Sequence, residues 1–322
     1  MGRIGRIVFL GTGSFGIPLL RRLPDMANEL LVVSAPDMPA GRGLQSRPSP
    51  VVTEARSLGL PLATPLRIRS DEGLAAIRDF APDGLLLAAY GQLVPADLLA
   101  LAPRQPLNVH PSLLPRHRGA SPVAAAILAG DAVSGVSVIV MTPELDAGPI
   151  VAQWAVPLRG REQAPELVAR LAALAADEVP PVLEAWAGPG VDAHPQDAAR
   201  ATVVRGFTRG DGRIDWSRPA DEVDRQVRAL QPWPGAWTTL GEQRLHVRRA
   251  HPDETAIDAA ATDDRAPAPD RRPGDLLPGV PVSVVTGRGL LVLDEVQPAG
   301  RPIMAADAWR NGIHHAPVRL GR

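Results

Sequence analysis

The chain has 322 residues, 45% of them hydrophobic and 21% charged, which is long enough for two domains and typical of a soluble globular protein. A formal net charge of −1 excludes a strongly basic nucleic-acid binder, and the absence of cysteine excludes disulfides, thiolate catalysis and cysteine-bound metals. No apolar run approaches the roughly 18 residues that span a bilayer, so we expect a cytoplasmic protein without membrane contact.

Short apolar segments alternate with helical patterns through the first half of the chain. Strands are predicted at residues 4–10, 30–35, 84–90 and 136–141, and helices at 17–23, 71–80 and 95–102. Residues 164–187 have the pattern of an amphipathic helix pair, broken at Pro180–Pro181. The alternation predicts an α/β, Rossmann-like domain with a mostly parallel sheet.

A segment rich in Gly, Pro, Ala and Asp separates this domain from a second one. We predict a first domain at 1–188, a linker at 189–204 and a smaller domain at 205–322. The second domain is predicted to be β-rich, with strands at 244–250, 282–287 and 289–297 and one helix at 220–230. The middle of the polar stretch at 251–275 is predicted to be a poorly ordered surface loop.

A glycine-rich turn follows the first predicted strand. Residues 11–16, Gly-Thr-Gly-Ser-Phe-Gly, have the G-x-G-x-x-G pattern of dinucleotide-binding sites, and Asp37 lies near where a ribose-binding acid would stand. However, Asp37 follows a proline and begins a loop instead of ending a strand. Two interpretations therefore stay open: a nicotinamide-type cofactor site, or a tight turn that needs glycine for its backbone. The second is favoured.

An amide and an imidazole stand two residues apart in the segment 106–115. Asn108 and His110 lie in a run that begins like a strand, so alternation places both side chains on one face. Open α/β folds bind their ligands at the ends of strands. An amide donor beside an imidazole suits the binding of an oxyanion and the transfer of a proton in acyl chemistry.

A second candidate site is the loop at 141–149, which follows the predicted strand at 136–141. Its Asp146 would orient His110 and stabilise its charge, as a carboxylate does for the histidine of hydrolytic triads. Spacing alone leaves two ordinary alternatives open, namely a histidine with a purely structural role and an aspartate that forms a turn.

Taken together, these segments resemble the 10-formyltetrahydrofolate-dependent formyltransferase family. The resemblance rests on four motifs in order: Asn108-Val109-His110, Ser112-Leu113-Leu114-Pro115-Arg116, Arg118-Gly119-Ala120 and Leu145-Asp146-Ala147-Gly148. It implies that Asn108, His110 and Asp146 are the catalytic trio, with 10-formyltetrahydrofolate as formyl donor and no metal. It also implies a folate pocket lined by Ser112, Leu113, Leu114, Pro115, Tyr90, Gly91, Gln92 and Leu93.

Other segments resemble the branch of this family whose acceptor is initiator methionyl-tRNA. Residues 39–43 with 48–51 are similar to the long loop that enters the tRNA acceptor arm, and 214–216, 231–237 and 297–304 are similar to an OB-like β-barrel domain. The resemblance implies a monomer that binds initiator methionyl-tRNA. The arginines expected at the tRNA are Arg42, Arg47, Arg205 and Arg209, with Arg213, Arg244, Arg248 and Arg249 as further candidates.

The chain departs from the family pattern at several positions. Gly13 stands where proline is common, Pro111 where glycine is usual, and His117 where tryptophan is usual. Residues 44–47 are less basic than usual for the tRNA loop, which bears on the strength of tRNA binding. Residues 256–273 look like an insertion.

Four other functions are weighed against this one. A sugar-nucleotide N-formyltransferase would use the same trio and donor, and a formyltetrahydrofolate hydrolase would use water in place of the amine. From other classes, an NAD(P)-binding oxidoreductase and a non-enzymatic RNA-binding protein stay open. The loop at 39–43 and the segment at 231–237 favour the tRNA branch.

Overall fold

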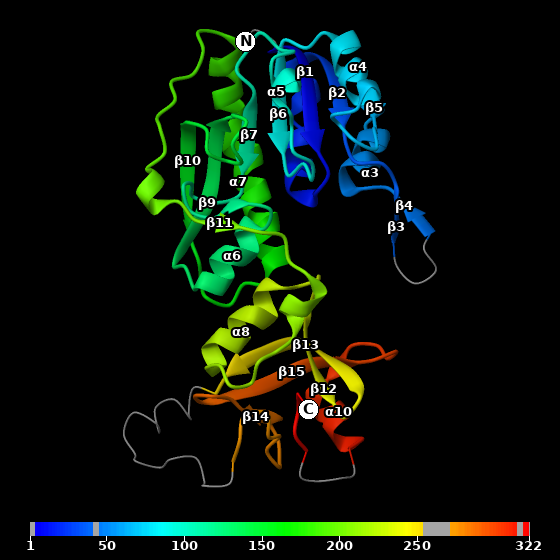
Figure 1. The fold of residues 1–322 in the computed structure, drawn as a ribbon, viewed down its shortest axis with the longest axis vertical. Helices are drawn as coiled ribbons and strands as arrows, with labels where there is room; N and C mark the ends of the chain where they lie inside the picture. The colour runs from blue at the N-terminus through cyan, green and yellow to red at the C-terminus, as the bar shows by residue number, and fades with distance from the viewer. Residues whose placement is uncertain (1–3, 41–44, 254–270, 314–317, 322) are drawn as a thin grey trace. The chain divides into compact units, whose positions relative to one another are not determined.

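The computed structural model describes residues 4–40, 45–253, 271–313 and 318–321 (Figure 1). The chain divides into two compact units. Unit 1 holds residues 1–123, 132–158 and 166–205, and unit 2 holds residues 124–131, 159–165 and 206–322. Arg42 lies outside the described residues. So does most of the polar stretch at 251–275, which includes the apparent insertion at 256–273, and the predictions for both stay predictions.

Unit 1 is built on a seven-stranded sheet. In chain order its strands are β1 (Ile4–Gly11), β2 (Ala27–Val33), β5 (Leu62–Ala63), β6 (Gly84–Ala88), β7 (Leu107–His110), β9 (Val133–Val140) and β10 (Ile150–Pro157). Their spatial order is β10-β9-β7-β6-β1-β2-β5. In this spatial order, the five strands β7, β6, β1, β2 and β5 pair in parallel with their neighbours. Strand β9 is antiparallel to both β7 and β10. The Rossmann-like, mostly parallel α/β prediction is confirmed.

Apolar side chains explain why the central strands are buried. Val8, Phe9 and Leu10 of β1 and Leu86 of β6 are inaccessible to solvent. Such runs of Val, Ile and Leu are expected where helices cover both faces of a parallel sheet. The other elements of the chain up to residue 204 are η1 (Ser14–Gly16), α1 (Ile17–Leu20), α2 (Leu23–Met26), β3 (Met38–Ala40), β4 (Gln45–Arg47), α3 (Pro50–Ser57), α4 (Asp71–Phe80), α5 (Ala96–Leu99), β8 (Arg118–Gly119), α6 (Pro122–Ala129), α7 (Ala164–Ala187), η2 (Ala198–Arg200) and β11 (Val203–Val204).

The helix predicted at 17–23 is wrong in extent. The chain forms two short helices there, α1 and α2, separated by Arg21 and Arg22. Pro24 lies in the first turn of α2, where proline is tolerated, and it has no N–H to donate to the carbonyl of Leu20, which favours a break between the two helices. By contrast α4 has the predicted limits, because Ser70 caps its first turn by accepting from Gly73 N.

The break predicted at Pro180–Pro181 is also wrong. Helix α7 runs without interruption for 24 residues from Ala164 to Ala187. Each proline removes one backbone hydrogen bond. The buried stripe nevertheless continues past them, with Val179 before the prolines and Leu183 and Trp186 after them. Packing of this apolar stripe outweighs the lost hydrogen bonds.

Unit 2 carries a five-stranded antiparallel sheet with one long helix. Its elements are η3 (Arg209–Gly212), α8 (Ala220–Ala229), β12 (Ala236–Leu240), β13 (Gln243–Pro252), β14 (Ser283–Val285), β15 (Leu290–Pro298), β16 (Met304–Ala305) and α10 (Ala306–Asn311). The predicted smaller β-rich domain, with its helix and three strands, is confirmed with ends shifted by a few residues. The predicted limits of the two domains and of the linker stay a prediction.

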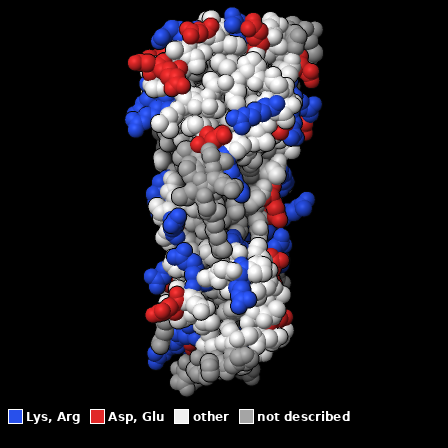
Figure 2. All heavy atoms as spheres, turned by 90° about the vertical axis from the view of Figure 1, so that its right-hand side faces the viewer, with Lys and Arg blue, Asp and Glu red and all other residues white. Residues whose placement is uncertain are grey.

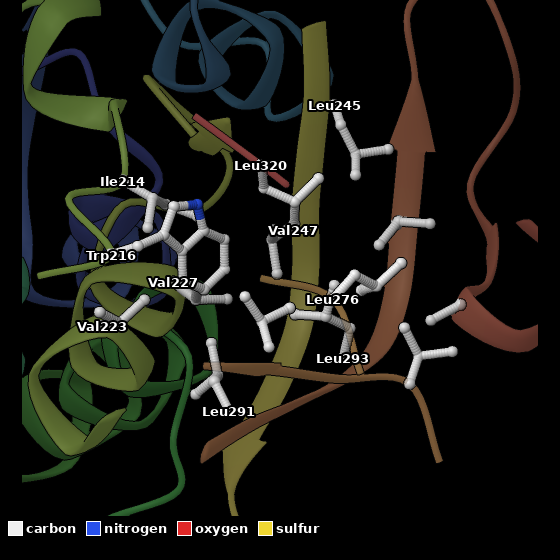
Figure 3. Close-up of a cluster of buried hydrophobic side chains, with 14 of the residues drawn as sticks. Ile214, Trp216, Val223, Val227, Leu245, Val247, Leu276, Leu291, Leu293 and Leu320 are labelled. Carbon is white, nitrogen blue, oxygen red and sulfur yellow. The ribbon is translucent and has the colours of Figure 1, made fainter. Parts of the chain in front are cut away.

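The core of unit 2 is organised around a tryptophan (Figure 3). The ring of Trp216 lies among Val223 and Val227 of α8 and Val247 and Leu291 of the sheet. Its Nε1 donates to Thr238 Oγ1 over 3.0 Å, so the buried indole has no unsatisfied donor. Ile214 and Trp216, from a segment that the sequence grouped with the second domain, thus form part of its core.

No helix in the described part of the chain is long and apolar enough to cross a membrane.

Gly84 gives a test of the packing between β6 and α7. A Cβ placed at Gly84 would overlap the buried ring of Trp186, whose Nε1 donates to Gln105 O over 2.9 Å. We expect Gly84→Ala to lower the free energy of unfolding by about 1–3 kcal/mol, because the indole cannot move without losing this bond. Urea denaturation followed by circular dichroism measures the change. Gly188→Ala is the matched control, since its Cβ would make only ordinary contacts; equal stability of both variants would contradict the prediction.

Candidate active site

The topology of unit 1 creates a switch point between two central strands. From β1 the chain proceeds outward through β2 to β5, and then crosses to β6 and β7 on the other side of β1. Open α/β sheets bind ligands where the strand order reverses in this way, outside the carboxyl ends of the strands. The carboxyl ends of β1, β6 and β7 are Gly11, Ala88 and His110.

The glycine-rich turn after β1 is occupied by the protein's own backbone. The amides of Thr12 and Gly13 both donate to Ala89 O over 3.1 Å, which ties the end of β1 to the end of β6. A Cβ at Gly16 would crowd the ring of Phe9 and the carbonyl of Ala88. A dinucleotide site would instead point these amides at a pyrophosphate. The geometry favours the structural interpretation of the G-x-G-x-x-G string.

Three side chains predicted from the sequence meet beside the face of β7. Asn108 and His110 are both buried, and Asp146 reaches them from the loop between β9 and β10. Asn108 Nδ2 donates to Asp146 Oδ1 over 3.0 Å, and His110 Nδ1 lies 3.6 Å from Asp146 Oδ2. The amide of Gly119 donates to the same Oδ2 over 2.8 Å. One carboxylate therefore contacts both side chains that strand alternation placed on one face.

The hydrogen bonds of His110 identify its basic nitrogen. His110 Nε2 lies 3.0 Å from the carbonyl oxygen of His117. A carbonyl oxygen only accepts, so Nε2 carries the proton and the lone pair of the neutral ring is on Nδ1, next to Asp146. Burial lowers the pKa of His110, and this effect outweighs the nearby Asp146 carboxylate, which raises it. The ring is therefore neutral at pH 7 and can accept a proton at Nδ1.

The backbone around these side chains is held in an uncommon conformation. Ala89, His117 and Asp146 have φ values of 52°, 60° and 50°, in the left-handed region that glycine and asparagine ordinarily occupy. Such residues concentrate at functional sites, where surrounding contacts hold them in place. Here His117 presents its carbonyl to His110, and Asp146 presents its carboxylate.

The residues predicted to line the folate pocket have different surroundings. Ser112 is fully buried and donates to Arg116 O over 2.7 Å, and the buried Leu114 donates its amide to Ser137 Oγ over 3.1 Å. Gln92 accepts from the amide of Ile68 over 2.8 Å, whereas Leu93 is exposed. The remaining four, Leu113, Pro115, Tyr90 and Gly91, are half-buried or exposed. Leu93 is therefore open to solvent and the Ser112 hydroxyl is already bonded, and the predicted folate pocket stays a prediction.

At the switch point, two buried hydroxyls have no hydrogen-bond partner among the residues that the structure describes. They are Thr12 Oγ1, after β1, and Tyr90 Oη, after β6. Burial raises the pKa of Tyr90 to about 12, so the phenol keeps its proton and can donate. Leaving a buried polar atom without a partner costs roughly 1–3 kcal/mol, so both hydroxyls are candidates to bond a bound molecule.

Several contacts of the site were missed by the analysis of the sequence. The Gly119 amide, the His117 carbonyl and the side chain of Gln196 all contact the trio or its loop. Backbone groups have no signature in residue type, and Gln196 lies in a segment with linker composition. No signal in a single sequence could have found them.

The candidate tRNA-binding arginines in the described residues differ in their exposure and in the contacts that they make within the protein. Arg47, Arg205, Arg209 and Arg213 are exposed. Arg244 stacks over the ring of Trp237 at 4.0 Å, Arg249 lies 3.7 Å from Glu295, and Arg248 bonds Gln231 and Gln297. Figure 2 shows basic and acidic side chains interspersed over the face that it presents. Arg248 is therefore bound within unit 2, and the exposed arginines are the better candidates for a phosphate.

Residues 5–183 match the formyl transferase family, and residues 207–314 match the formyl transferase C-terminal domain. The chain belongs to the formyl transferase family. The first match contains the trio and the turn at the switch point, and the second contains the antiparallel sheet of unit 2.

Curated relatives place the enzyme within this family. A methionyl-tRNA formyltransferase of Roseiflexus castenholzii is 45% identical over 312 residues, which are 96% of this chain and 96% of the relative. One from Thermus thermophilus is 39% identical over 325 residues, covering 98% of this chain and 99% of the relative. The chain is therefore an enzyme of the methionyl-tRNA formyltransferase group.

Two solved structures share the fold at low identity. HypX from Aquifex aeolicus, in complex with tetrahydrofolic acid, matches with a TM-score of 0.64 at 17% identity over 94% of this chain and 46% of that chain. WlaRD, a sugar 3N-formyl transferase, matches with a TM-score of 0.64 at 13% identity over 94% of this chain and all of its own. These likenesses show the fold alone.

The His110 ring gives a direct test of the site's electrostatics. We expect the pKa of His110 to lie below the usual 6.5, because burial disfavours the imidazolium. Asp146→Asn should lower this pKa further, since it removes the negative charge that favours the protonated ring. NMR titration of the ring signals, assigned with a His110→Gln variant, measures both values. A wild-type pKa above 6.5, or a rise in Asp146→Asn, would contradict the prediction.

Proposed function

We propose that this formyltransferase transfers the formyl group of 10-formyltetrahydrofolate to the α-amine of initiator methionyl-tRNA. The observation that carries the proposal is the buried contact of Asn108 and His110 with the Asp146 carboxylate. Membership of the formyl transferase family supports formyl transfer, and the tetrahydrofolic acid bound to HypX supports a folate-type donor. The names and near-complete coverage of the curated relatives support methionyl-tRNA as the acceptor.

The reaction exchanges one C–N bond for another. The amine of methionyl-tRNA attacks the formyl carbon and forms a C–N bond, which gives a tetrahedral intermediate with a negative oxygen. The bond between the formyl carbon and N10 then breaks, and N10 takes up a proton as the folate leaves. The amine loses one proton in the process, so the proton count balances.

The geometry gives each side chain of the trio a separate task. Asn108 Nδ2 has two N–H groups; one donates to Asp146, and the other is available for the oxyanion. His110 accepts the amine's proton on Nδ1 and can return it to N10. Asp146 stabilises the resulting imidazolium and holds its position, as a carboxylate does for histidine in hydrolytic triads.

The folate would lie at the switch point, within reach of this trio. The unpartnered hydroxyls of Thr12 and Tyr90 are available there for the polar groups of the donor. The described residues contain no group of three or more His, Asp or Glu side chains that could hold a metal ion. The mechanism above draws only on the protein's own side chains and the folate.

A comparison of acceptors tests the proposed function. We expect the protein to formylate charged initiator methionyl-tRNA with 10-formyltetrahydrofolate, and to leave amino sugar nucleotides unchanged under the same conditions. Asp146→Asn is the matched control, with turnover at least about 10²-fold lower and tRNA affinity unaltered. Product is measured by incorporation of radiolabelled formyl groups. Efficient formylation of the amino sugar, with none of the tRNA, would overturn the assignment of the acceptor.

The exposed arginines give a test of tRNA binding. We expect Arg209→Ala to weaken tRNA binding and to reduce the slope of log affinity against log salt by about one, because one phosphate contact is lost. Filter binding over a range of salt concentrations measures the slope. Arg78→Ala, at an exposed position of α4, is the matched control. An identical slope in both variants would remove Arg209 from the tRNA surface.

A further inference from the structure

The segment that follows α7 is joined to the residues around the trio, all within unit 1. His194 and Ile150 exchange two backbone hydrogen bonds, of 2.8 and 2.9 Å. Further along, β11 pairs in parallel with β8, and Thr202 Oγ1 accepts from the amide of His117 over 2.8 Å. Residues 194–204 therefore contact the part of the chain that supplies the His117 carbonyl and the Gly119 amide.

Gln196 makes the most concentrated set of contacts in this segment. Its Nε2 donates to Asp146 O over 2.8 Å and to Gly148 O over 2.7 Å. Its Oε1 accepts from Nε and Nη2 of Arg118 over 3.0 and 2.7 Å. A single half-buried amide thus joins the backbone of the acidic loop to the strand that carries Gly119.

We propose that Gln196 is a positioning residue that holds the acidic loop so that the Asp146 carboxylate stays between Asn108, His110 and the Gly119 amide. The proposal rests on the function proposed above, because it assigns Asp146 its part in the reaction. Gln196 touches no reacting atom, and it acts through Asp146.

The acidic loop needs such a contact because its own conformation is strained. Asp146 is held at a φ of 50°, and residues 143–145 on its approach are exposed. Both carbonyls that Gln196 binds, those of Asp146 and Gly148, lie on this strained part of the loop. The two N–H groups of Gln196 Nε2 therefore bind the backbone at Asp146 itself and two residues after it.

The contact requires an uncharged amide of this length. The two carbonyls accept and the guanidinium of Arg118 donates, so the bridging side chain must present donors at one end and an acceptor at the other. Methionine has nearly the same length and volume, but it offers no donor and only the weak acceptor of its thioether sulfur. Gln196→Met therefore removes the hydrogen bonds while it preserves the space that the side chain fills.

Loss of Gln196 should act on turnover more than on substrate binding. We expect Gln196→Met and Gln196→Ala to lower kcat by roughly 10 to 100-fold, because small misplacements of catalytic groups cost about this much. The KM values for donor and acceptor should stay within about twofold, since no substrate contact is removed. Asp197→Ala is the matched control: it removes the exposed cap of η2 in the same segment without touching the acidic loop.

NMR titration of His110 separates positioning from loss of fold. The charged and titratable groups that face the ring are Asp146 and His117. A carboxylate that has moved away raises the pKa of His110 less, so this pKa should be lower in both Gln196 variants than in wild type and Asp197→Ala. If a substitution only destabilised the fold, a smaller fraction of the protein would be active. The apparent kcat would then fall, but the pKa of His110 in the folded molecules would stay the same.

The outcomes distinguish this proposal from the proposed function. If both Gln196 variants match Asp197→Ala in kcat and in the His110 titration, Gln196 does not position Asp146 and the inference is overturned. If wild type fails to formylate methionyl-tRNA while the Gln196 variants still shift the titration, the proposed acceptor fails and the positioning stands. Circular dichroism shows which variants are folded. If either Gln196→Met or Gln196→Ala is not folded, the other variant provides the test.

Discussion

The arrangement of the site depends on one buried carboxylate. Asp146 receives hydrogen bonds from a side chain of β7 and from the backbone amide of Gly119, and it lies beside the imidazole of His110. A carboxylate is stable in such a buried place only when its oxygens are bonded. The strand, the loop after Pro115 and the acidic loop must therefore converge, and each contact that secures one of them also places Asn108, His110 and Asp146.

The fold supplies this convergence through its strand order. Because β1 and β6 are neighbours whose connections leave in opposite directions, their carboxyl ends open a place for a ligand, and β7 carries Asn108 and His110 next to it. The amides of Thr12 and Gly13 bond Ala89 O and so join the ends of β1 and β6. A string that resembles a cofactor motif thus ties two strands together, because the amides of Thr12 and Gly13 are already bonded to Ala89 O.

The segment after α7 extends the site beyond the elements of the sheet. Its composition suggested a spacer, yet Gln196 bonds two carbonyls of the acidic loop, and Thr202 bonds the backbone of His117. These bonds join the backbone of residues 194–204 to the backbone around Asp146 and His117, so a change in the conformation of one affects the other. The backbone that carries the Asp146 carboxylate is therefore bonded by a segment that lies outside the seven-stranded sheet.

The sequence by itself determined the α/β class, the limits of α4 and the pairing of Asn108 with His110, because caps and strand alternation are local properties of the chain. It also predicted the trio and the family. Tertiary structure decided that α7 continues past its prolines, because a buried stripe outweighs two lost hydrogen bonds. The bond between Gln196 and Asp146 joins residues 50 positions apart, and only folding brings such partners together.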